Sequence, residues 1–357
     1  MKIIVSAGGT GGHIYPALAI INKFKEKEKD LEVLYIGTHN RMEKDIIPKE
    51  NIKYESLEIY GFSKTNILRD IKNINLIRKA KKKCKKIMLD FKPDVVIGAG
   101  GYVTYPVISV ASKLGIKTFI HEQNSIPGKS NLALAKKCSL IGVSFKESID
   151  YFKNSNVFYS GNPCSENAIN IKKADKTKLG FHNDKKLVIF VSGSLGSSSI
   201  NSKVKDYLVN FNDNYEILYI TGKNLYDNFV ENEKFNKNIK VIPFYNNLSS
   251  LMKSADLVVT RAGASTISEL VALNIPAIYI PSPYVANNHQ YYNALAIKNA
   301  HAGEMIEEKD LNSEIIKNKI NEILNDSNKI NIMKENLKKL AIKNSSEKIY
   351  EKIKEII

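Results

Sequence analysis

The chain has 357 residues, of which 43% are hydrophobic and 25% charged, a profile typical of a globular protein with two domains. The three cysteines form no metal-ligand or redox spacing and are too few for a disulfide framework, which fits a reducing compartment. The net charge is +16, and residues 1–160 carry +12 of it, so this part of the chain is expected to face an anionic partner.

The first motif is a glycine-rich turn at residues 8–12, which follows a short apolar run at residues 2–7. The run is too short before the glycines for a signal peptide, so it predicts a strand. Pro16 suits the first turn of the next helix, because proline lacks the N–H that is unsatisfied there. The turn has neither the lysine of G-x-x-x-x-G-K-[ST] nor the third glycine of G-x-G-x-x-G, so it matches neither of the two common nucleotide loops.

Strand-like and helical segments alternate through the first half of the chain, which predicts a parallel sheet with helices on both faces. Residues 95–112 form an uncharged stretch that approaches transmembrane length, but three glycines and a proline break it. We therefore predict a strand, a glycine loop and a helix there, and no membrane span. The strands of this half are predicted at residues 2–7, 32–37, 94–100, 117–123 and 139–144.

The same pattern restarts at residues 186–201, where a strand, a glycine turn and a helix follow one another again. The sequence therefore predicts an α/β fold of two doubly wound domains, at residues 1–160 and 161–340. From about residue 310 the chain has the pattern of an amphipathic helix, and we expect residues 341–357 to form a C-terminal helix that packs back on the first domain. The further strands are predicted at residues 215–222, 239–244, 255–265 and 275–283.

Residues 260–270, TRAGASTISEL, follow a predicted strand and open a helix. Gly263 lets the backbone approach a ligand, and the amides after it attract an anion through hydrogen bonds and the helix dipole. Glu269 lies about a turn and a half into the helix, where its carboxylate can accept hydrogen bonds from both hydroxyls of a ribose. A nucleotide site is one interpretation; the other is that Ser265 or Thr266 caps the helix and Glu269 is a solvated surface residue.

Residues 62–91 are strongly basic, and apolar residues are interleaved with their lysines and arginines. One interpretation is the solvated face of a helix; the other is a surface that binds an anionic membrane, as interfacial helices do. Each basic residue near an anionic leaflet contributes ~1 kcal/mol, so several would hold the chain there. A nucleic-acid partner is not predicted, because no nucleic-acid motif is present and the basic run lacks interleaved aromatics. The apolar residues are Ile67, Leu68, Ile71, Ile74, Leu76 and Ile77.

Six motifs occur in order across both halves: GGTGGHIYPALAI, GAGGYVTYP, HEQNSIPGKSN, GNP, TRAGASTISEL and NNHQYYNA. Together they resemble the MurG family, the bacterial N-acetylglucosaminyltransferases that convert lipid I to lipid II in peptidoglycan synthesis. The resemblance covers essentially the whole chain. The glycine motifs alone would indicate only the wider glycosyltransferase-B superfamily, whereas HEQN and RAGAST with HQYYNA are much more specific.

The resemblance implies two Rossmann-like domains that face each other across a cleft, the glycosyltransferase-B architecture. It implies an inverting, metal-independent hexosyltransferase without a cofactor. The donor, UDP-N-acetylglucosamine, would bind mainly to the C-terminal domain, and the undecaprenyl-linked acceptor, lipid I, mainly to the N-terminal domain. The chain has no D-x-D motif, with which metal-dependent nucleotide-sugar enzymes hold a cation, so helix N-termini and side-chain donors are expected to stabilise the leaving UDP.

The resemblance also implies a peripheral protein at the cytoplasmic face of the cell membrane. Its expected partners are the anionic membrane surface and other cell-wall synthesis proteins. Two other functions stay open at this point. A diacylglycerol glycosyltransferase would share the membrane surface but differ in sugar and acceptor, and a UDP-N-acetylglucosamine 2-epimerase would act on the donor without an acceptor.

Five features of the donor nucleotide site are implied by the resemblance. Glu269 resembles the ribose ligand, the segment 263–266 resembles the cradle of the diphosphate, and Ser194 resembles a phosphate contact. Arg261 matches a family arginine at the nucleotide site, and Tyr245 occupies the position whose backbone meets uracil. The resemblance therefore places the donor nucleotide mainly on the second domain.

The transferred sugar is expected to touch residues of both domains. Gln290, with His289, resembles the pair that contacts the donor sugar, and Asn124 resembles an asparagine that lies near it. Residues 10–12 are interpreted as the floor of the cleft, where the acceptor meets the donor sugar.

Two positions depart from the common family pattern. Ser165 stands where an arginine often follows GNPV, and Leu195 stands where GGSQG has a glutamine. Ser165 can still hydrogen-bond to a phosphate but has no charge, so donor affinity should depend more on Arg261 and the helix N-terminus. The complete set of expected substrate-binding residues is Thr10, Gly11, Gly12, Asn124, Ser165, Ser194, Tyr245, Arg261, Gly263, Ala264, Ser265, Thr266, Ile267, Ser268, Glu269, His289 and Gln290.

An inverting transfer needs a base that takes the proton of the acceptor hydroxyl. Histidine is the best-poised side chain at neutral pH, and His13 at the rim of the first glycine turn is the leading candidate. Its alternative role is structural, donating a hydrogen bond that shapes the turn. Glu122 in HEQN is the alternative base, and His121 is expected to support the end of its strand.

Overall fold

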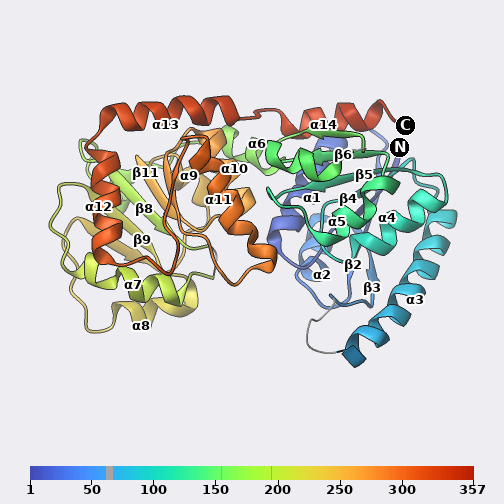
Figure 1. Cartoon of the computed structure of the whole chain (residues 1–357), viewed down its shortest axis with the longest axis horizontal. Helices are drawn as coiled ribbons and strands as arrows, with labels where there is room; N and C mark the ends of the chain where they lie inside the picture. Colours follow the sequence, from blue (N-terminus) through green and yellow to red (C-terminus); the bar gives the residue numbers. More distant parts are fainter. Residues whose placement is uncertain (62–66, 154, 194) are drawn as a thin grey trace. The chain divides into compact units, whose positions relative to one another are not determined.

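The computed structural model describes residues 1–61, 67–153, 155–193 and 195–357, without the side chains of residues 67–69. The chain divides into two units, which Figure 1 shows coloured along the sequence. Unit 1 comprises Met1–Cys164 and Asn344–Ile357, and unit 2 comprises Ser165–Lys343. Within these described ranges, no helix is both long and apolar enough to cross a membrane.

The described part of unit 1 is built on a seven-stranded parallel sheet in the order β3-β2-β1-β4-β5-β6-β7. The order reverses between β1 and β4, and open α/β sheets bind ligands at such a point. Strands β3 and β7 were not predicted, because β3 contains two charged residues and is only partly buried, and β7 has three residues. The strands are β1 (Lys2–Ser6), β2 (Glu32–Thr38), β3 (Lys53–Leu57), β4 (Val95–Gly98), β5 (Lys117–Glu122), β6 (Leu140–Val143) and β7 (Val157–Tyr159).

Helices cover both faces of this sheet, as the alternating pattern predicts. Helices α1 and α14 pack on one face around Phe24 and Tyr35, and α3, α4 and α5 pack on the other around Met88 and Ile120. The helices of unit 1 are α1 (Gly11–Lys27), α2 (Glu43–Ile46), α3 (Ile67–Phe91), α4 (Thr104–Lys113), α5 (Lys129–Leu134) and α14 (Ser345–Lys354), with short 3-10 helices at Ile47–Glu50, Ala135–Lys137 and Lys146–Phe152.

The sequence pattern from about residue 310 predicts one continuous amphipathic helix, and this prediction is wrong. The segment divides into α12, α13 and α14, because Asn312 and Asp326 each begin a new helix by accepting a hydrogen bond from its first turn. The last of these helices lies in unit 1, where Ile349 and Ile353 are fully buried in the core beside α1.

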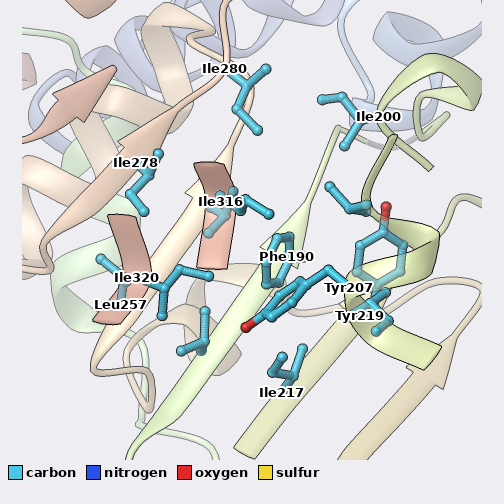
Figure 2. Close-up of a cluster of buried hydrophobic side chains, with 14 of the residues drawn as sticks. Phe190, Ile200, Tyr207, Ile217, Tyr219, Leu257, Ile278, Ile280, Ile316 and Ile320 are labelled. Atoms are coloured by element: carbon cyan, nitrogen blue, oxygen red, sulfur yellow. The ribbon is translucent and has the colours of Figure 1, made fainter. Parts of the chain in front are cut away.

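Unit 2 repeats the same plan over its described residues, with a six-stranded parallel sheet in the order β10-β9-β8-β11-β12-β13. The order reverses between β8 and β11. Figure 2 shows the core on one face of this sheet, where Phe190 and Tyr219 meet Tyr207 of α7 and Ile316 of α12. The strands are β8 (Leu187–Val191), β9 (Glu216–Ile220), β10 (Ile239–Ile242), β11 (Leu257–Thr260), β12 (Ala277–Tyr279) and β13 (Glu304–Met305).

The helices around this second sheet begin with α6 (Cys164–Asn170), which starts at the boundary between the units. The others are α7 (Ser198–Val209), α8 (Tyr226–Val230), α9 (Leu248–Met252), α10 (Ala264–Leu273), α11 (His289–Asn299), α12 (Ser313–Leu324) and α13 (Ser327–Leu340). Short 3-10 helices lie at Lys176–Leu179, Lys223–Leu225 and Ala286–Asn288. Both glycine-rich helix starts, α7 and α10, follow the two strands at the reversal.

Candidate active site

The glycine turn of unit 1 is held against the loop that follows β4. The amide of Gly8 donates to the carbonyl of Gly100 over 3.2 Å. Gly101 has a φ of +89°, and a Cβ at this position would lie 2.4 Å from the oxygen of Gly8. Only glycine permits this approach. The two loops at the strand reversal therefore form one bare backbone surface, to which Thr10 and Gly12 add exposed positions at the start of α1.

His13 lies half-buried beside this surface, and its two ring nitrogens have different surroundings. Nδ1 lies 3.0 Å from the carbonyl oxygen of Gly8, so it carries the proton and donates. In that tautomer Nε2 has its lone pair available, which is the form that a general base requires. A Cβ at Gly100 would lie 2.5 Å from Cδ2 of the ring, so Gly100 makes room for His13. The structural role expected as an alternative for His13 is thus compatible with a catalytic one.

Glu43 also belongs to this loop cluster, although no sequence motif marks it. Its side chain is fully buried, and its Oε2 accepts a hydrogen bond from the amide of Gly9 over 3.1 Å. Its Oε1 accepts two more, from the amide and the hydroxyl of Thr38 at 2.9 and 2.6 Å. A buried carboxylate that is bonded in this way fixes the glycine turn to the end of β2. A glutamate just after a strand was the available signal, but its reach to Gly9 depends on the tertiary fold.

Glu122 has all its bonding capacity engaged inside the HEQN loop. It is 2% exposed, and its Oε1 accepts from the amide of Asn124 at 2.9 Å and from its side chain at 3.3 Å. Its Oε2 accepts from the amide of Gly128 at 2.9 Å and from Asn131 Nδ2 at 2.8 Å. The Glu122 carboxylate therefore holds the backbone and the side chain of Asn124 in place, and each of its oxygens already accepts two hydrogen bonds.

His121 has the supporting position that the sequence suggests. Burial lowers its pKa to about 4, so the ring is neutral at physiological pH. Its Nε2 donates to the carbonyl of Gly161 over 3.0 Å, and its Nδ1 accepts from Gln123 Nε2 over 3.0 Å. The ring therefore ties the end of β5 to the segment after β7.

In unit 2 the N-terminus of α10 is open. The N-cap residue is Gly263, which has extended backbone and no side chain, so the first amides of the helix have no cap. The alternative in which Ser265 or Thr266 caps this helix is therefore wrong. Uncapped amides at a helix start are available to an anion such as a diphosphate.

Glu269 lies on the same helix and is not a freely solvated residue. Its Oε2 accepts a hydrogen bond from the hydroxyl of Ser249 in α9 over 2.9 Å. Burial raises the pKa of Glu269, and the bond from Ser249 opposes part of that rise. Two expected binding residues lie between Gly263 and Glu269. The side chain of Ile267 is buried, and the hydroxyl of Ser268 donates to the carbonyl of Ala264 within the helix, so both side chains contact the protein itself.

Arg261 is fixed at the end of β11 by a second buried carboxylate that the sequence did not reveal. Its Nη1 lies 2.5 Å from Glu308 Oε2 and donates to the carbonyl of Ile280, and its Nη2 donates to Ser197 Oγ over 2.8 Å. Glu308 is 6% exposed and also accepts from the hydroxyl of Ser199 over 2.6 Å. The guanidinium is thereby held between the N-terminus of α7 and the loop that follows β13.

Arg261 lines a pocket of about 800 Å³, which we call the donor pocket. Gln290 also lines it, and its Oε1 accepts from the amide of Ser282 over 2.9 Å, so its Nε2 is held in a defined orientation. The pocket lies at the strand reversal of the second sheet. The lining residues are Ser192, Gly193, Leu195, Gly196, Ser197, Ser198, Ser199, Lys223, Asn224, Leu225, Arg261, Ser282, Tyr284 and Gln290.

Of the expected substrate-binding residues, Arg261 and Gln290 line the donor pocket, whereas the other described ones of unit 2, including the segment 263–269, do not. Ser194 lies outside the described residues. Tyr245, between β10 and α9, does not line the pocket, and His289 directs Nδ1 toward the carbonyl of Ala286 at 2.8 Å. Ser165 is 3% exposed and its hydroxyl lies 3.5 Å from the carbonyl of Ile342, so its contact is with the chain itself. In the described residues, no group of three or more His, Cys, Asp or Glu side chains is arranged to hold a metal ion.

Comparison with known proteins decides the family. Residues 3–143 match the model of the glycosyltransferase family 28 N-terminal domain, and residues 187–351 match that of the C-terminal domain. The UDP-N-acetylglucosamine--N-acetylmuramyl-(pentapeptide) pyrophosphoryl-undecaprenol N-acetylglucosamine transferase of Bacillus cytotoxicus is 41% identical over 362 residues, which span all of both chains. The chain belongs to the MurG family. The family expected from the sequence motifs is thus confirmed.

Solved structures show the same fold. The crystal structure of Acinetobacter baumannii MurG matches with a TM-score of 0.83 at 24% identity and covers 99% of each chain. A UDP-GlcNAc 2-epimerase from Neisseria meningitidis, bound to UDP-GlcNAc, matches with a TM-score of 0.68 at 12% identity and covers 99% of this chain and 100% of its own. The predicted pair of Rossmann-like domains is confirmed, and the epimerase alternative is not favoured for a chain of the MurG family.

Proposed function

We propose that this chain transfers N-acetylglucosamine from UDP-N-acetylglucosamine to the 4-hydroxyl of the N-acetylmuramoyl unit of lipid I, which gives lipid II for peptidoglycan synthesis. The observation that carries the proposal is the full-length identity of 41% to a transferase of that name. The site geometry agrees with it, since unit 2 has a pocket suited to a nucleotide sugar and unit 1 has a histidine with an available lone pair.

The donor binds to unit 2 in this proposal. The uncapped amides of α10 and the fixed guanidinium of Arg261 hold the diphosphate. The carboxylate of Glu269 accepts hydrogen bonds from the hydroxyls of the ribose, and these bonds replace the one from the Ser249 hydroxyl. Gln290 presents Nε2 to a hydroxyl of the sugar. Each group is held in place before the ligand arrives, which lowers the entropic cost of binding.

Transfer proceeds by attack of the acceptor hydroxyl on the anomeric carbon with inversion. His13 Nε2 takes the proton as the oxygen–carbon bond forms, and the carbonyl of Gly8 stabilises the resulting imidazolium through its bond to Nδ1–H. The bond between the anomeric carbon and the diphosphate oxygen breaks, and the negative charge on the departing UDP is stabilised by the α10 amides and Arg261.

The membrane-facing surface is also part of the proposal. A pocket of about 500 Å³ in unit 1 is lined by apolar and aromatic side chains of α3, α4 and the loop after β3, with three basic residues among them. Ile71 and Ile74 on α3 are 55% and 44% exposed, whereas Leu76 is buried. The pocket residues are Ile59, Tyr60, Ile74, Ile77, Arg78, Lys81, Tyr102, Tyr105, Lys129, Ser130 and Ala133.

This combination suits contact with an anionic lipid surface at the cytoplasmic face of the membrane. Ile67 and Leu68 are also expected to contribute to this membrane contact, but their side chains are not among those that the structure describes. Sedimentation with anionic vesicles tests it. Binding should weaken as salt rises and should fall in Ile74→Glu, while Ile315→Glu, which changes an exposed isoleucine of unit 2, serves as the matched control. Binding that ignores both salt and Ile74→Glu would refute this surface.

The function itself is tested by incubating the protein with labelled UDP-N-acetylglucosamine and a short-chain lipid I analogue. We expect a labelled disaccharide product that appears only when the acceptor is present. Conversion of the donor without acceptor would indicate the epimerase, and a labelled product with diacylglycerol would indicate the lipid glycosyltransferase. Either result without disaccharide would overturn the proposal.

A further inference from the structure

A different pocket of unit 2, of about 760 Å³, lies at the edge of the sheet opposite to the donor pocket. Lys186, Asp256 and Pro276 line it, and each directly precedes a strand, β8, β11 or β12. Since the strands are parallel, their amino ends share one edge and their carboxyl ends, with Arg261, share the other. This pocket therefore belongs to neither the donor site nor the glycine turns.

Six lysines from four segments of unit 2 line this pocket, and we call it the basic pocket. Asp175, Asp184 and Asp256 also line it, so the side chains give it a net charge of about +3. In the described part of the chain, none of the six lysines forms an ion pair with a carboxylate. The lysines are Lys173, Lys176, Lys185, Lys186, Lys253 and Lys334.

Two of the aspartates are engaged by the chain instead. Asp256 accepts a hydrogen bond from the amide of Leu187 over 2.8 Å. Asp175 accepts from the amide and the hydroxyl of Thr177 at 3.0 and 2.6 Å, and these bonds lower its pKa. These two carboxylates accept hydrogen bonds from neutral donors and form no ion pair with a lysine of the pocket, so the pocket keeps its net charge of about +3.

Four of the ammonium groups are anchored by uncharged oxygens. Lys253 donates to the carbonyls of Ile169 and Ile171, both at 2.9 Å. Lys185 donates to Asn238 Oδ1 over 3.0 Å. Lys176 and Lys186 donate to the carbonyls of Lys185 and Leu324. An ammonium group has three donors, so each of these lysines retains at least one donor beyond its anchors.

Lys173 and Lys334 differ from these four, since the ammonium group of neither forms a hydrogen bond or ion pair with a described residue. They are the two cations of the pocket whose removal breaks no bond within unit 2. Substitution at these positions therefore tests ligand binding without removing an anchor of the fold.

We propose that the basic pocket binds a small anion with several phosphate groups. Its volume lies within the range of small-molecule sites, roughly 300–1,000 Å³. All its cations are lysines, which bind phosphate groups as compact charges with three divergent donors. The anchored ammonium groups are held in position before binding, which lowers the entropic cost of collecting like charges around one ligand.

Calorimetric titration of the full chain with inorganic tripolyphosphate tests the proposal, at about 0.15 M salt so that long-range attraction is screened. UDP is present in excess to occupy the donor pocket. We expect one tripolyphosphate per chain. The double variant K173E/K334E should bind roughly tenfold or more weakly, because two attractive charges become repulsive.

The matched control is K234E/K237E, which makes the same charge change at two exposed lysines outside the pocket and should bind as the wild type does. The milder K173Q/K334Q keeps the test valid if the charge reversal impairs folding, which the thermal unfolding midpoint will reveal. Absence of binding to the wild type, or equal weakening in both glutamate variants, would overturn the proposal.

The phosphate groups could belong to a soluble molecule or to a lipid headgroup, and a second arm separates these sources. Sedimentation with vesicles that contain phosphatidate should be reduced by K173E/K334E and competed by tripolyphosphate if the pocket takes a headgroup. Tripolyphosphate binding without vesicle binding at this pocket identifies a soluble ligand. Binding of neither probe contradicts the site.

Discussion

The two units place their functional loops at the same topological point but equip them differently. In unit 1 a buried carboxylate, Glu43, holds a backbone amide of the glycine turn, and His13 stands beside it with an available nitrogen. In unit 2 a buried carboxylate, Glu308, holds the guanidinium of Arg261 next to an uncapped helix. In the proposed function, the same fold thus positions a proton acceptor in one unit and an anion-binding cation in the other.

The largest effect is expected from removing the proton acceptor of unit 1. His13→Ala should lower kcat by about 10²–10⁴-fold, the usual contribution of a general base, and leave the KM for UDP-N-acetylglucosamine nearly unchanged. Steady-state kinetics with a soluble acceptor measures both values. His39→Ala, a histidine of unit 1 outside the glycine turn, is the control. Near wild-type turnover in His13→Ala would refute the division of roles between the units.

Arg261→Ala, in unit 2, should instead affect mainly the binding of the donor. We expect the KM for UDP-N-acetylglucosamine to rise roughly 10–100-fold, because a fixed cation at the diphosphate is lost. The variant should also be less stable by about 3–5 kcal/mol, since Glu308 is left as a buried, unpaired charge. Adding Glu308→Gln should restore most of the stability, measured by urea unfolding, but not the KM. A KM that recovers along with stability would show that Arg261 acts only structurally.

A pH effect is expected from the support of the unit 1 loops. The pKa of His121 is lowered to about 4 in the folded chain, so an unfolded histidine binds a proton at higher pH than the folded one. The free energy of unfolding should therefore fall as the pH drops from about 6.5 toward 4, by up to about 3 kcal/mol from this group. His121→Gln should flatten that part of the stability profile. An unchanged slope would mean that other groups cause it.

The smallest effect is expected at Glu43, which acts through the glycine turn. Glu43→Gln replaces a carboxylate that accepts three hydrogen bonds, and we expect kcat to fall about tenfold with little change in donor KM. Glu58→Gln, at an exposed position of the same unit, is the matched control. A raised donor KM with unchanged kcat would place Glu43 on the donor side of the comparison instead.

The sequence predicted the strands that are buried on both faces, since continuous β-branched runs mark them, and it located both glycine-rich helix starts. It missed β3, β7 and β13, whose short or partly charged sequences depend on their neighbours for strand structure. It also missed Glu43 and Glu308, because a lone glutamate in a loop gives no sign of the distant amide or guanidinium that it will meet. The interpretation in which Ser265 or Thr266 caps α10 is wrong because the helix begins after Gly263, a position set by the backbone conformation and not by a capping side chain.

The place of α14 has a consequence for how the protein is made. Ile349 and Ile353 fill part of the core beneath α1, yet they are synthesised only after all of Ser165–Lys343 has left the ribosome. During translation unit 1 therefore waits with one side of α1 uncovered, while unit 2, a continuous stretch, can fold first. A nascent chain stalled before residue 344 would expose the apolar surface around Phe24 and become a natural client for chaperones.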